Sequence, residues 1–438
     1  STKSPSFSKT SSKTSSTFSS TFSHTEPIFP WVASKEKFPL GIASLAEQIR
    51  SQYELDFGML VCPELVTEPF AKLHPDWCLA PDSGEFGYRA QHRTLNSSKS
   101  PLMLLNLTLP KVRSLVLEQL CALIDSVKCT YLKWSIPKYA LSIVYSCFQN
   151  RSSFTHRYYL GLYNLLAALY MRYPNLLIEF SAGGGARFDT GMLAFAACCS
   201  TSENTDAISS IFTQYGTSFM FPLLSITSFV TSVPNHQNYR YSPFKLRALV
   251  ALCGTFGCQL NLTKATPEVL NTLKYYLALR ERFSRLIALG NFYRLVSPFC
   301  SVTSFHQQQQ RNNIVAWMVV SPTASQALVF VFNLHHEPST YYPRLKLRGL
   351  HDKRVYRVEE LCPGALRQNQ NTGAIEMDRT KPVYHNLYGS ITPIVSGRAL
   401  MYAGLPIKFD YDGDCALFRI VALQSNIENA RENTKMII

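Results

Sequence analysis

Hydrophobic and polar positions alternate in two different ways along the first two-thirds of the chain. Two longer stretches, at residues 111–126 and 155–173, place apolar residues at helical spacing, and Pro110 precedes the first of them. Short apolar runs predict strands at 57–62, 130–134 and 176–180. The order strand, helix, strand, helix is typical of parallel βα units. Continued to about residue 295, the pattern predicts an α/β fold with most of a (β/α)8 barrel of the TIM type.

The pattern changes after Ser304, where short apolar runs follow one another without a helical stretch until the tail. These runs are IVAWMVV, ALVFVF, RLKLRGL, RVYRVEEL and ALFRIVAL. They predict a separate antiparallel β-sandwich. The predicted organisation is therefore a Ser/Thr-rich leader at 1–25, whose composition indicates disorder, an incomplete barrel at 26–304 and a sandwich at 305–438.

Composition narrows the range of partners. The chain carries 43 Lys and Arg against 29 Asp and Glu, a formal net charge of +14, yet it has neither a basic stripe interleaved with aromatics nor a zinc-finger or helix-turn-helix spacing. We therefore expect scattered solvated cations and no nucleic-acid partner. No apolar run reaches the roughly 18 residues of a transmembrane helix, so we expect no membrane partner. The 12 cysteines show no CxxC pair or metal-ligand spacing, which predicts no metal site and leaves secreted and cytoplasmic compartments both open.

Local signatures follow the predicted strands in a fixed order. They are PWVASKEKFPLG (30–41), FGMLVCPELVTEPFAKLHPDW (57–77), KWSIPK (133–138), GGGARFDTGML (183–193), SENTDA (202–207) and VPNHQ (233–237). Taken in this order over residues 29–300, the series resembles glycoside hydrolase family 36, the α-galactosidases of the melibiase or raffinose type. The resemblance implies a (β/α)8 barrel followed by a C-terminal sandwich, and retaining hydrolysis of terminal α-galactoside sugars. It implies no cofactor, and assembly into a homo-oligomer.

The resemblance places the two catalytic positions at Ser135 and Glu203. Retaining hydrolysis needs a nucleophilic carboxylate and an acid/base about 5–5.5 Å apart. The family's nucleophile is the Asp of a KWD motif, and here that position is Ser135, a hydroxyl without a neighbouring base and without a charge. Glu203 occupies the position of the family's acid/base Asp and adds one methylene. We therefore expect weak or absent catalysis, unless a displaced carboxylate such as Asp189 or Asp206 substitutes.

The resemblance also implies a set of sugar-contacting positions. They are Trp31, Lys133, Trp134, Ser181, Gly183, Gly184, Arg187 and Asp206. Two departures alter the family's pattern, because Ser181 replaces a Cys and Pro137 replaces an Asn. Purely structural roles stay open beside sugar binding. Lys133 would extend into solvent for want of a carboxylate at position 135, the glycine run would allow close backbone approach, and Arg187 would form a structural ion pair with Asp189.

Family members carry an N-terminal domain and two barrel strands before the position of Trp31. In this chain only the Ser/Thr-rich leader precedes it, so we expect an open barrel with unpaired strand edges, covered by another subunit or left by truncation. Three functions stay open: an active α-galactosidase, a non-catalytic galactoside-binding pseudoenzyme or partner subunit of a full-length homologue, and a degenerate chain with neither property.

Overall fold

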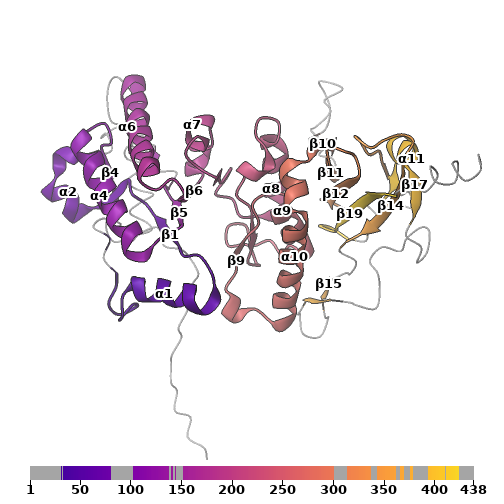
Figure 1. Ribbon diagram of the computed structural model, residues 1–438, viewed down its shortest axis with the longest axis horizontal. Helices are drawn as coiled ribbons and strands as arrows, with labels where there is room; N and C mark the ends of the chain where they lie inside the picture. The colour runs from indigo at the N-terminus through magenta and orange to yellow at the C-terminus, as the bar shows by residue number, and fades with distance from the viewer. Residues whose placement is uncertain are drawn as a thin grey trace, which may run out of the picture.

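The computed structural model describes residues 31, 33–79, 102–137, 140–141, 144, 151–299, 313–336, 343–361, 366–368, 375–377, 393–409 and 411–423. The leader predicted at 1–25 and the boundary predicted at residue 304 lie outside these residues. The molecule is elongated. In Figure 1 the parallel strands and their helices occupy the left and centre, and the antiparallel strands occupy the right.

The parallel strands form one arc. Four of them pair in the order β1 (Gly58–Val61), β5 (Tyr131–Trp134), β6 (Leu177–Phe180) and β7 (Cys198–Cys199). A bridge between Cys199 and Ile226 leads into the parallel pair β8 (Phe229–Thr231) and β9 (Gly257–Gln259). The predicted parallel βα units are thereby confirmed. Within the described residues, β1 and β9 end the arc, and each pairs with a strand on one side only.

Helices follow the strands along the chain. The longer ones are α1 (Ile42–Tyr53), α4 (Pro110–Val127), α6 (Arg151–Arg172), α8 (Ala207–Thr217), α9 (Phe244–Leu252) and α10 (Pro267–Leu289). The predicted helix at 111–126 is confirmed as α4, with Pro110 in its first turn. Val112, Val116 and Leu120 are fully buried, and their spacing of four residues places them on one face. α6 begins earlier than the sequence pattern predicted.

Short elements occupy the connections between these units. Between β1 and α4 lie β2 (Leu65–Thr67), α2 (Glu68–Leu73), η1 (Pro75–Trp77), β3 (Cys78–Leu79) and β4 (Leu102–Leu105), and the three strands pair in the order β2-β4-β3. After β6 come the 3-10 helix η2 (Gly183–Gly185) and α7 (Thr190–Leu193). The 3-10 helices η3 (Leu223–Ser225) and η4 (Leu262–Lys264) precede β8 and α10.

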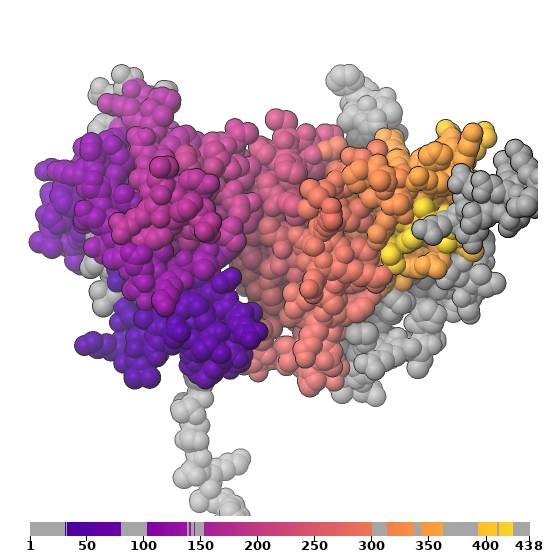
Figure 2. Space-filling model, in the orientation of Figure 1, coloured from indigo at the N-terminus to yellow at the C-terminus, as the bar shows by residue number. Residues whose placement is uncertain are grey.

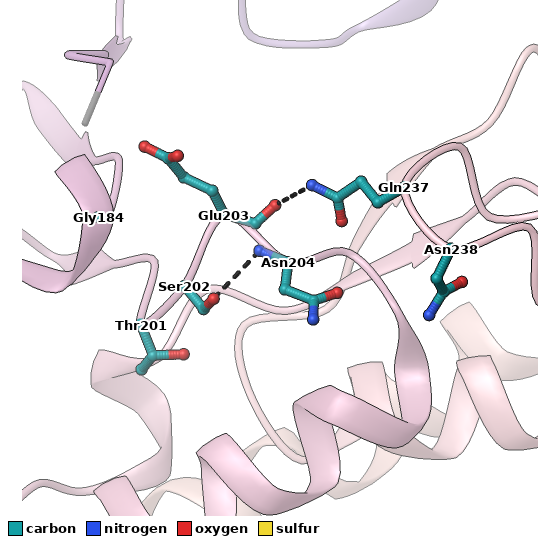
Figure 3. A pocket seen from close by; sticks show the side chains of 7 residues that line it. All are labelled: Gly184, Thr201, Ser202, Glu203, Asn204, Gln237 and Asn238. Carbon is teal, nitrogen blue, oxygen red and sulfur yellow. Dashed lines mark hydrogen bonds between the residues drawn. The ribbon is translucent and has the colours of Figure 1, made fainter. Parts of the chain in front are cut away.

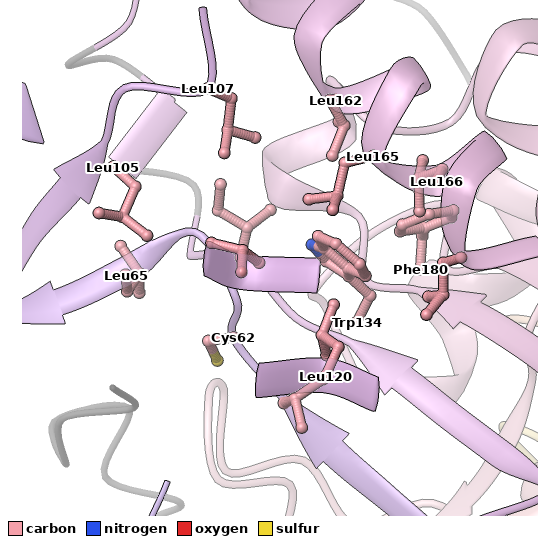
Figure 4. Packing of buried hydrophobic residues seen from close by; sticks show 14 of the residues in the cluster. Cys62, Leu65, Leu105, Leu107, Leu120, Trp134, Leu162, Leu165, Leu166 and Phe180 are labelled. Atoms are coloured by element: carbon pink, nitrogen blue, oxygen red, sulfur yellow. The ribbon is translucent and has the colours of Figure 1, made fainter. Parts of the chain in front are cut away.

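The face of the arc that meets the helices is a hydrophobic core. Along β5, Leu132 and Trp134 are fully buried in a cluster with residues of α4 and α6, whereas Tyr131 and Lys133 are half-buried on the opposite face. Figure 4 shows Trp134 among Leu120, Leu162, Leu165 and Leu166. Leu60, which pairs with Lys133 in register, is 50% exposed on the inner face. The inner face of the arc is therefore open at its β1 end.

The antiparallel sheet follows. Its strand order is β10 (Asn291–Val296), β11 (Ile314–Val320), β12 (Gln326–Asn333), β19 (Cys415–Ala422), β14 (Val355–Glu360) and β17 (Ile394–Ser396). Alternate residues of β11 enter two cores: Val315 and Trp317 cluster with α9 and α10, while Ala316 and Met318 cluster with the other side. That side holds β13 (Arg344–Leu345), α11 (Gly397–Tyr402) and β18 (Leu405–Pro406).

Two details complete the antiparallel region. β10 already belongs to its main sheet, although it precedes the boundary predicted at residue 304. A further two-stranded pair consists of β15 (Leu366–Gln368) and β16 (Ile375–Met377). The predicted sandwich requires a second layer packed against the main sheet, and the segment with β13, α11 and β18 occupies that position.

Candidate active site at the carboxyl ends of the parallel strands

Loops after β6, β7 and β8 surround a pocket of about 460 Å³ (Figure 3). Its lining residues are Gly184, Thr201, Ser202, Glu203, Asn204, Gln237 and Asn238. These loops leave the carboxyl ends of parallel strands, where ligands of α/β barrels bind. Hydroxyl and amide side chains dominate the lining, and Glu203 is its one acid. Such a lining suits a ligand rich in hydroxyl groups.

Glu203 lies on this pocket with its backbone fixed and its carboxylate exposed. The Gln237 side chain donates from Nε2 to the Glu203 carbonyl at 2.8 Å and accepts at Oε1 from the Thr205 amide at 2.8 Å. One amide thus ties the loop after β7 to the turn after β8. In Figure 3 the Glu203 carboxylate points away from Gln237. The predicted acid/base position therefore presents a solvated carboxylate on a fixed backbone.

Asn235 shapes the turn that supplies Gln237. It is buried, its Oδ1 accepts from the Gln237 amide at 2.9 Å, and its Nδ2 donates to Thr205 Oγ1 at 2.9 Å. Both residues lie in the segment VPNHQ, for which the sequence predicted no role of Asn235 or Gln237. Asn residues commonly form turns in which the side chain accepts a hydrogen bond from the backbone amide two residues later. The presence of Asn235 in this segment was therefore a sequence signal for the turn.

Ser135 follows β5 directly and is only 5% exposed. Its amide donates to the Val61 carbonyl at 2.8 Å, which continues the pairing of β5 with β1. Burial raises the pKa of the neighbouring Cys62 thiol to about 11, although a hydrogen bond with the Ser135 side chain partly offsets the increase. The thiol beside Ser135 is therefore protonated at neutral pH and cannot act as a base toward the hydroxyl.

Ser181 fixes the backbone just beyond Ser135. Its hydroxyl oxygen accepts from the Ile136 amide at 2.9 Å and donates to the Ile136 carbonyl at 3.3 Å. The Ser181 amide also donates to the Trp134 carbonyl at 2.9 Å. The residue predicted to contact sugar thus has its hydroxyl engaged by the backbone of the neighbouring strand. Its contribution is to hold the end of β5 against the end of β6.

Lys133 does not extend into solvent. Its Nζ lies 2.7 Å from Glu179 Oε1, and the two side chains are 20% and 2% exposed. The ammonium also lies 4.5 Å from the centre of the Phe229 ring, and the Tyr131 hydroxyl donates to the other oxygen of Glu179. Burial, with Glu179 adding to it, raises the pKa of Tyr131, so the phenol remains a donor. Glu179 is thus the carboxylate that holds Lys133 on the inner face.

Glu64 is the centre of a fully buried polar network that sequence analysis missed. Its Oε2 accepts from Arg187 Nη2 at 2.6 Å and from the Tyr158 hydroxyl at 2.6 Å. Its Oε1 accepts from Trp134 Nε1 at 2.9 Å. Both members of the Glu64–Arg187 pair are 0% exposed. The sequence offered one signal, an acid among the apolar residues that follow the first predicted strand.

This network changes the roles predicted for Trp134 and Arg187. Both were placed at the sugar by resemblance, but both are fully buried on the helix side of the strands. Arg187 pairs with Glu64 and not with Asp189, and its guanidinium lies 5.1 Å from the centre of the Tyr159 ring. Burial lowers the pKa of Arg187, but Glu64 and the two tyrosines raise it by more, so the side chain stays charged. The two residues belong to the buried network around Glu64 and are not among the residues that line the pocket.

The candidate displaced carboxylates both cap helices. Asp206 accepts from the Ser209 amide at 3.1 Å and hydroxyl at 2.9 Å at the start of α8, and it pairs with Arg240. Asp189 accepts from the Met192 amide at 2.9 Å at the start of α7. Asp206 is 1% exposed and is not among the residues that line the pocket. Each of the two carboxylates thus has an oxygen engaged at a helix N-terminus.

The glycine run and Trp31 complete the predicted set. Gly183 and Gly184 have φ angles of +54° and +73°, which favour glycine. A Cβ on Gly183 would lie 2.9 Å from Leu141 Cδ1, whereas Gly184 lines the pocket. Trp31 is partly buried against the cluster that contains Trp134. The loop after β6 thus approaches the end of β5 closely because it lacks side chains.

The described part of the chain offers no metal centre and no membrane span. No group of three His, Cys, Asp or Glu side chains there could hold a metal ion. None of the helices described above is both long and apolar enough to cross a membrane.

Comparison with known proteins defines the class. Residues 16–290 match the melibiase family, and residues 314–420 match the glycosyl hydrolase family 36 C-terminal domain. Alpha-galactosidase AgaA from Geobacillus stearothermophilus is 34% identical over 336 residues, which is 76% of this chain and 43% of that protein. Alpha-galactosidase Mel36A from Lactobacillus acidophilus is 33% identical over 336 residues, 75% of this chain and 42% of that protein.

Solved structures agree. The AgaA structure superposes with a TM-score of 0.71 at 30% identity over 90% of this chain and 48% of that one. The alpha-galactosidase from Lactobacillus brevis gives a TM-score of 0.73 at 27% identity over 92% of this chain and 49% of that one. The fold is thus that of a glycoside hydrolase with a TIM-type barrel and a C-terminal β-sandwich. The chain belongs to the melibiase family, glycoside hydrolase family 36. It spans less than half the length of these relatives.

Proposed function

We propose that this chain recognises terminal α-galactosides at the pocket on Glu203 and hydrolyses them weakly or not at all. The relatives named above carry the description alpha-galactosidase, which supports the substrate class. The pocket lining of hydroxyl and amide groups is suited to sugar hydroxyls. The observation that carries the proposal is Ser135, a buried hydroxyl at the position where retaining hydrolysis requires a carboxylate.

The chemistry of the remaining acids supports weak or absent hydrolysis. Glu203 has an exposed carboxyl group, which in its protonated form can donate a proton to a leaving oxygen. A covalent glycosyl intermediate is not expected, because the thiol of Cys62, which lies beside the Ser135 hydroxyl in the described part of the chain, stays protonated. The buried carboxylates of Glu64 and Glu179 are each held by a cation. A proton donor without a nucleophile gives slow cleavage of activated substrates at most.

The second candidate is galactoside binding without any turnover, as a pseudoenzyme or as the partner of a full-length homologue. It is favoured by the contrast between the buried network of Glu64 and position 135. The scaffold under the pocket retains a fully hydrogen-bonded Glu64, while position 135 has no charge. Such a scaffold can hold a sugar without cleaving it.

Two measurements on the unmodified chain separate these functions. Initial rates are measured with an activated aryl α-galactoside, with the matched α-glucoside as the control, and equilibrium binding of galactose is measured by calorimetry. We expect galactose to bind and turnover to lie close to the rate of an identically purified blank. Turnover that falls on the Glu203→Gln change identifies a weak hydrolase. Turnover well above the blank that survives that change, or a folded chain that binds no galactose, would contradict the proposal.

A further inference from the structure

A group of exposed cations lies on the antiparallel region, away from the pocket. Three segments are tied together there by backbone hydrogen bonds. The Leu347 amide donates to the Leu400 carbonyl at 3.1 Å, which joins the segment after β13 to α11, and the Ile407 amide donates to the Pro343 carbonyl at 3.0 Å. In Figure 1 α11 lies at the right-hand end of the molecule, whereas β6 and α7, which flank the loop with Gly184, lie left of centre.

The segment after the start of β13 exposes a row of cations. Leu345 and Leu347 are buried, whereas the residues between and beside them are exposed. Those exposed residues are Arg344, Lys346 and Arg348. Alternation of this kind puts every second side chain on one face, and alternate residues of an extended chain lie about 7 Å apart. The buried leucines therefore anchor the segment in the core and turn its cations outward.

Neighbouring positions extend the positive surface. Arg354 and Arg398 are exposed, and they are adjacent because the Gly397 amide donates to the Arg354 carbonyl at 2.8 Å. Within the described residues 343–361 and 393–409, Glu360 is buried and Glu359 pairs with Arg357 and Arg419. That leaves Asp352 as the exposed, unpaired acid of these two ranges. The three cations of the row have no ion-pair partner among the described residues. This face is therefore a local group of exposed cations on the antiparallel region.

The chemistry of this face restricts its partner. Uncompensated cations attract polyanions, and the attraction falls with salt. The row contains no aromatic residue on which the bases of single-stranded nucleic acid could stack. It is carried by a short segment that begins with the two-residue strand β13 and not by a helix that could enter a major groove. Its leucines are buried, so it offers no apolar anchor to a lipid surface.

We propose that the row Arg344, Lys346 and Arg348, with Arg354 and Arg398 beside it, binds a linear anionic polysaccharide. Carboxylate groups repeated along an extended glycan chain would meet cations repeated along an extended protein segment. Such a surface holds the chain on a carbohydrate matrix independently of what happens at the pocket. The inference concerns a different face from the pocket and stands whether or not the chain hydrolyses galactosides.

The test is binding of the full chain to immobilised polygalacturonate over a series of NaCl concentrations. The test variant is Arg344→Gln/Lys346→Gln/Arg348→Gln. The matched control is Arg282→Gln/Arg285→Gln/Lys274→Gln on α10, which removes two Arg and one Lys from exposed positions elsewhere. We expect the test variant to lose roughly tenfold or more in affinity and the salt dependence to become shallower by roughly 2 to 3 in slope, because three cations are removed and each neutralised anion contributes just under 1. The control should stay within about twofold.

Each other result overturns the proposal. Equal losses in the two variants would mean that net charge alone binds the polymer. Failure of the unmodified chain to bind would remove the site, and tighter binding of duplex DNA than of polygalacturonate at equal salt would assign the surface to a different partner. Far-ultraviolet circular dichroism checks that both variants are folded. The single change Lys346→Gln, which touches no buried residue, should lose an intermediate share of the affinity if the triple variant proves unstable.

Discussion

Glu64 follows β1 and Glu203 follows β7, and the surroundings of these two acids differ completely. Glu64 is fully buried and accepts hydrogen bonds from Trp134, Tyr158 and Arg187. Glu203 is exposed, and only its backbone is held, by Gln237. The difference is that Glu64 belongs to a buried, hydrogen-bonded network, whereas Glu203 is the one acid among the pocket-lining residues and is solvated. The contrast is greatest at Ser135, which the framework holds in place without giving it a charge or a base.

Removing the buried acid should have the largest effect on stability. The change Glu64→Gln leaves Arg187 charged and without its counterion in the core, so we expect the free energy of unfolding to fall by about 3–5 kcal/mol. Urea unfolding followed by circular dichroism measures the loss. Glu203→Gln is the matched control, and it should change stability by less than about 0.5 kcal/mol because that carboxylate is exposed. Equal effects of the two changes would contradict the contrast.

Glu360 is a second buried acid, and it lies on β14, outside the pocket. It extends the comparison between buried and exposed acids. Glu360 lies 3.5 Å from Lys245, and both are nearly buried. Burial raises the pKa of Glu360 to about 7, with Lys245 lowering it and Asp414 raising it further. Because the folded state holds this proton more tightly than the unfolded state, its stabilising contribution is complete below the unfolded pKa near 4.5 and is lost as pH rises through about 7.

The measurement is the pH dependence of unfolding in the unmodified chain and in the Glu360→Gln variant. We expect the unmodified chain to lose up to about 3 kcal/mol between pH 4.5 and 7.5 from this group, since one pKa unit corresponds to about 1.4 kcal/mol. The variant should show a flatter profile over that window. Identical profiles would mean that Glu360 does not titrate there.

The two capping acids should give smaller losses. Asp206→Ala removes the cap of α8 and the partner of Arg240, and we expect a loss of about 2 kcal/mol. Asp189→Ala removes a cap from the short α7 and should cost about 1 kcal/mol. Thermal unfolding of the two variants side by side checks the order. A variant of either residue that keeps its stability but loses galactose binding would show that the residue contacts the sugar after all.

Much of the fold could be predicted from the sequence because it rests on periodicity. The helix at 111–126 and the strand at 130–134 followed from apolar spacing alone. Trp134 could not be assigned to a face in that way, because its neighbour Lys133 also belongs to a motif associated with sugar. Which of the two points inward depends on pairing with β6, and that pairing joins residues far apart in the sequence.

The residues of the site could likewise be predicted only where their roles do not depend on contacts between distant parts of the sequence. Glu203 and Ser135 were located by their motifs, but Glu64 was not, because its partners Tyr158 and Arg187 lie 94 and 123 residues away along the chain. The role of Gln237 depends on the contact of two loops, which no local pattern records. The positive row was missed for a related reason. Its cations alternate with leucines, so the sequence suggested a strand, and only the fold showed that these cations have no ion-pair partner among the described residues.

The most direct test of the central claim restores the missing charge. Initial rates with an activated aryl α-galactoside are compared for the unmodified chain, Ser135→Asp, and Ser135→Asp combined with Glu203→Gln. The account predicts that the first stays near the blank and the second becomes active, and that the third loses about a hundredfold or more because the general acid is gone. An unmodified chain as active as the Ser135→Asp variant would contradict it. So would a folded, galactose-binding Ser135→Asp variant that remains inactive.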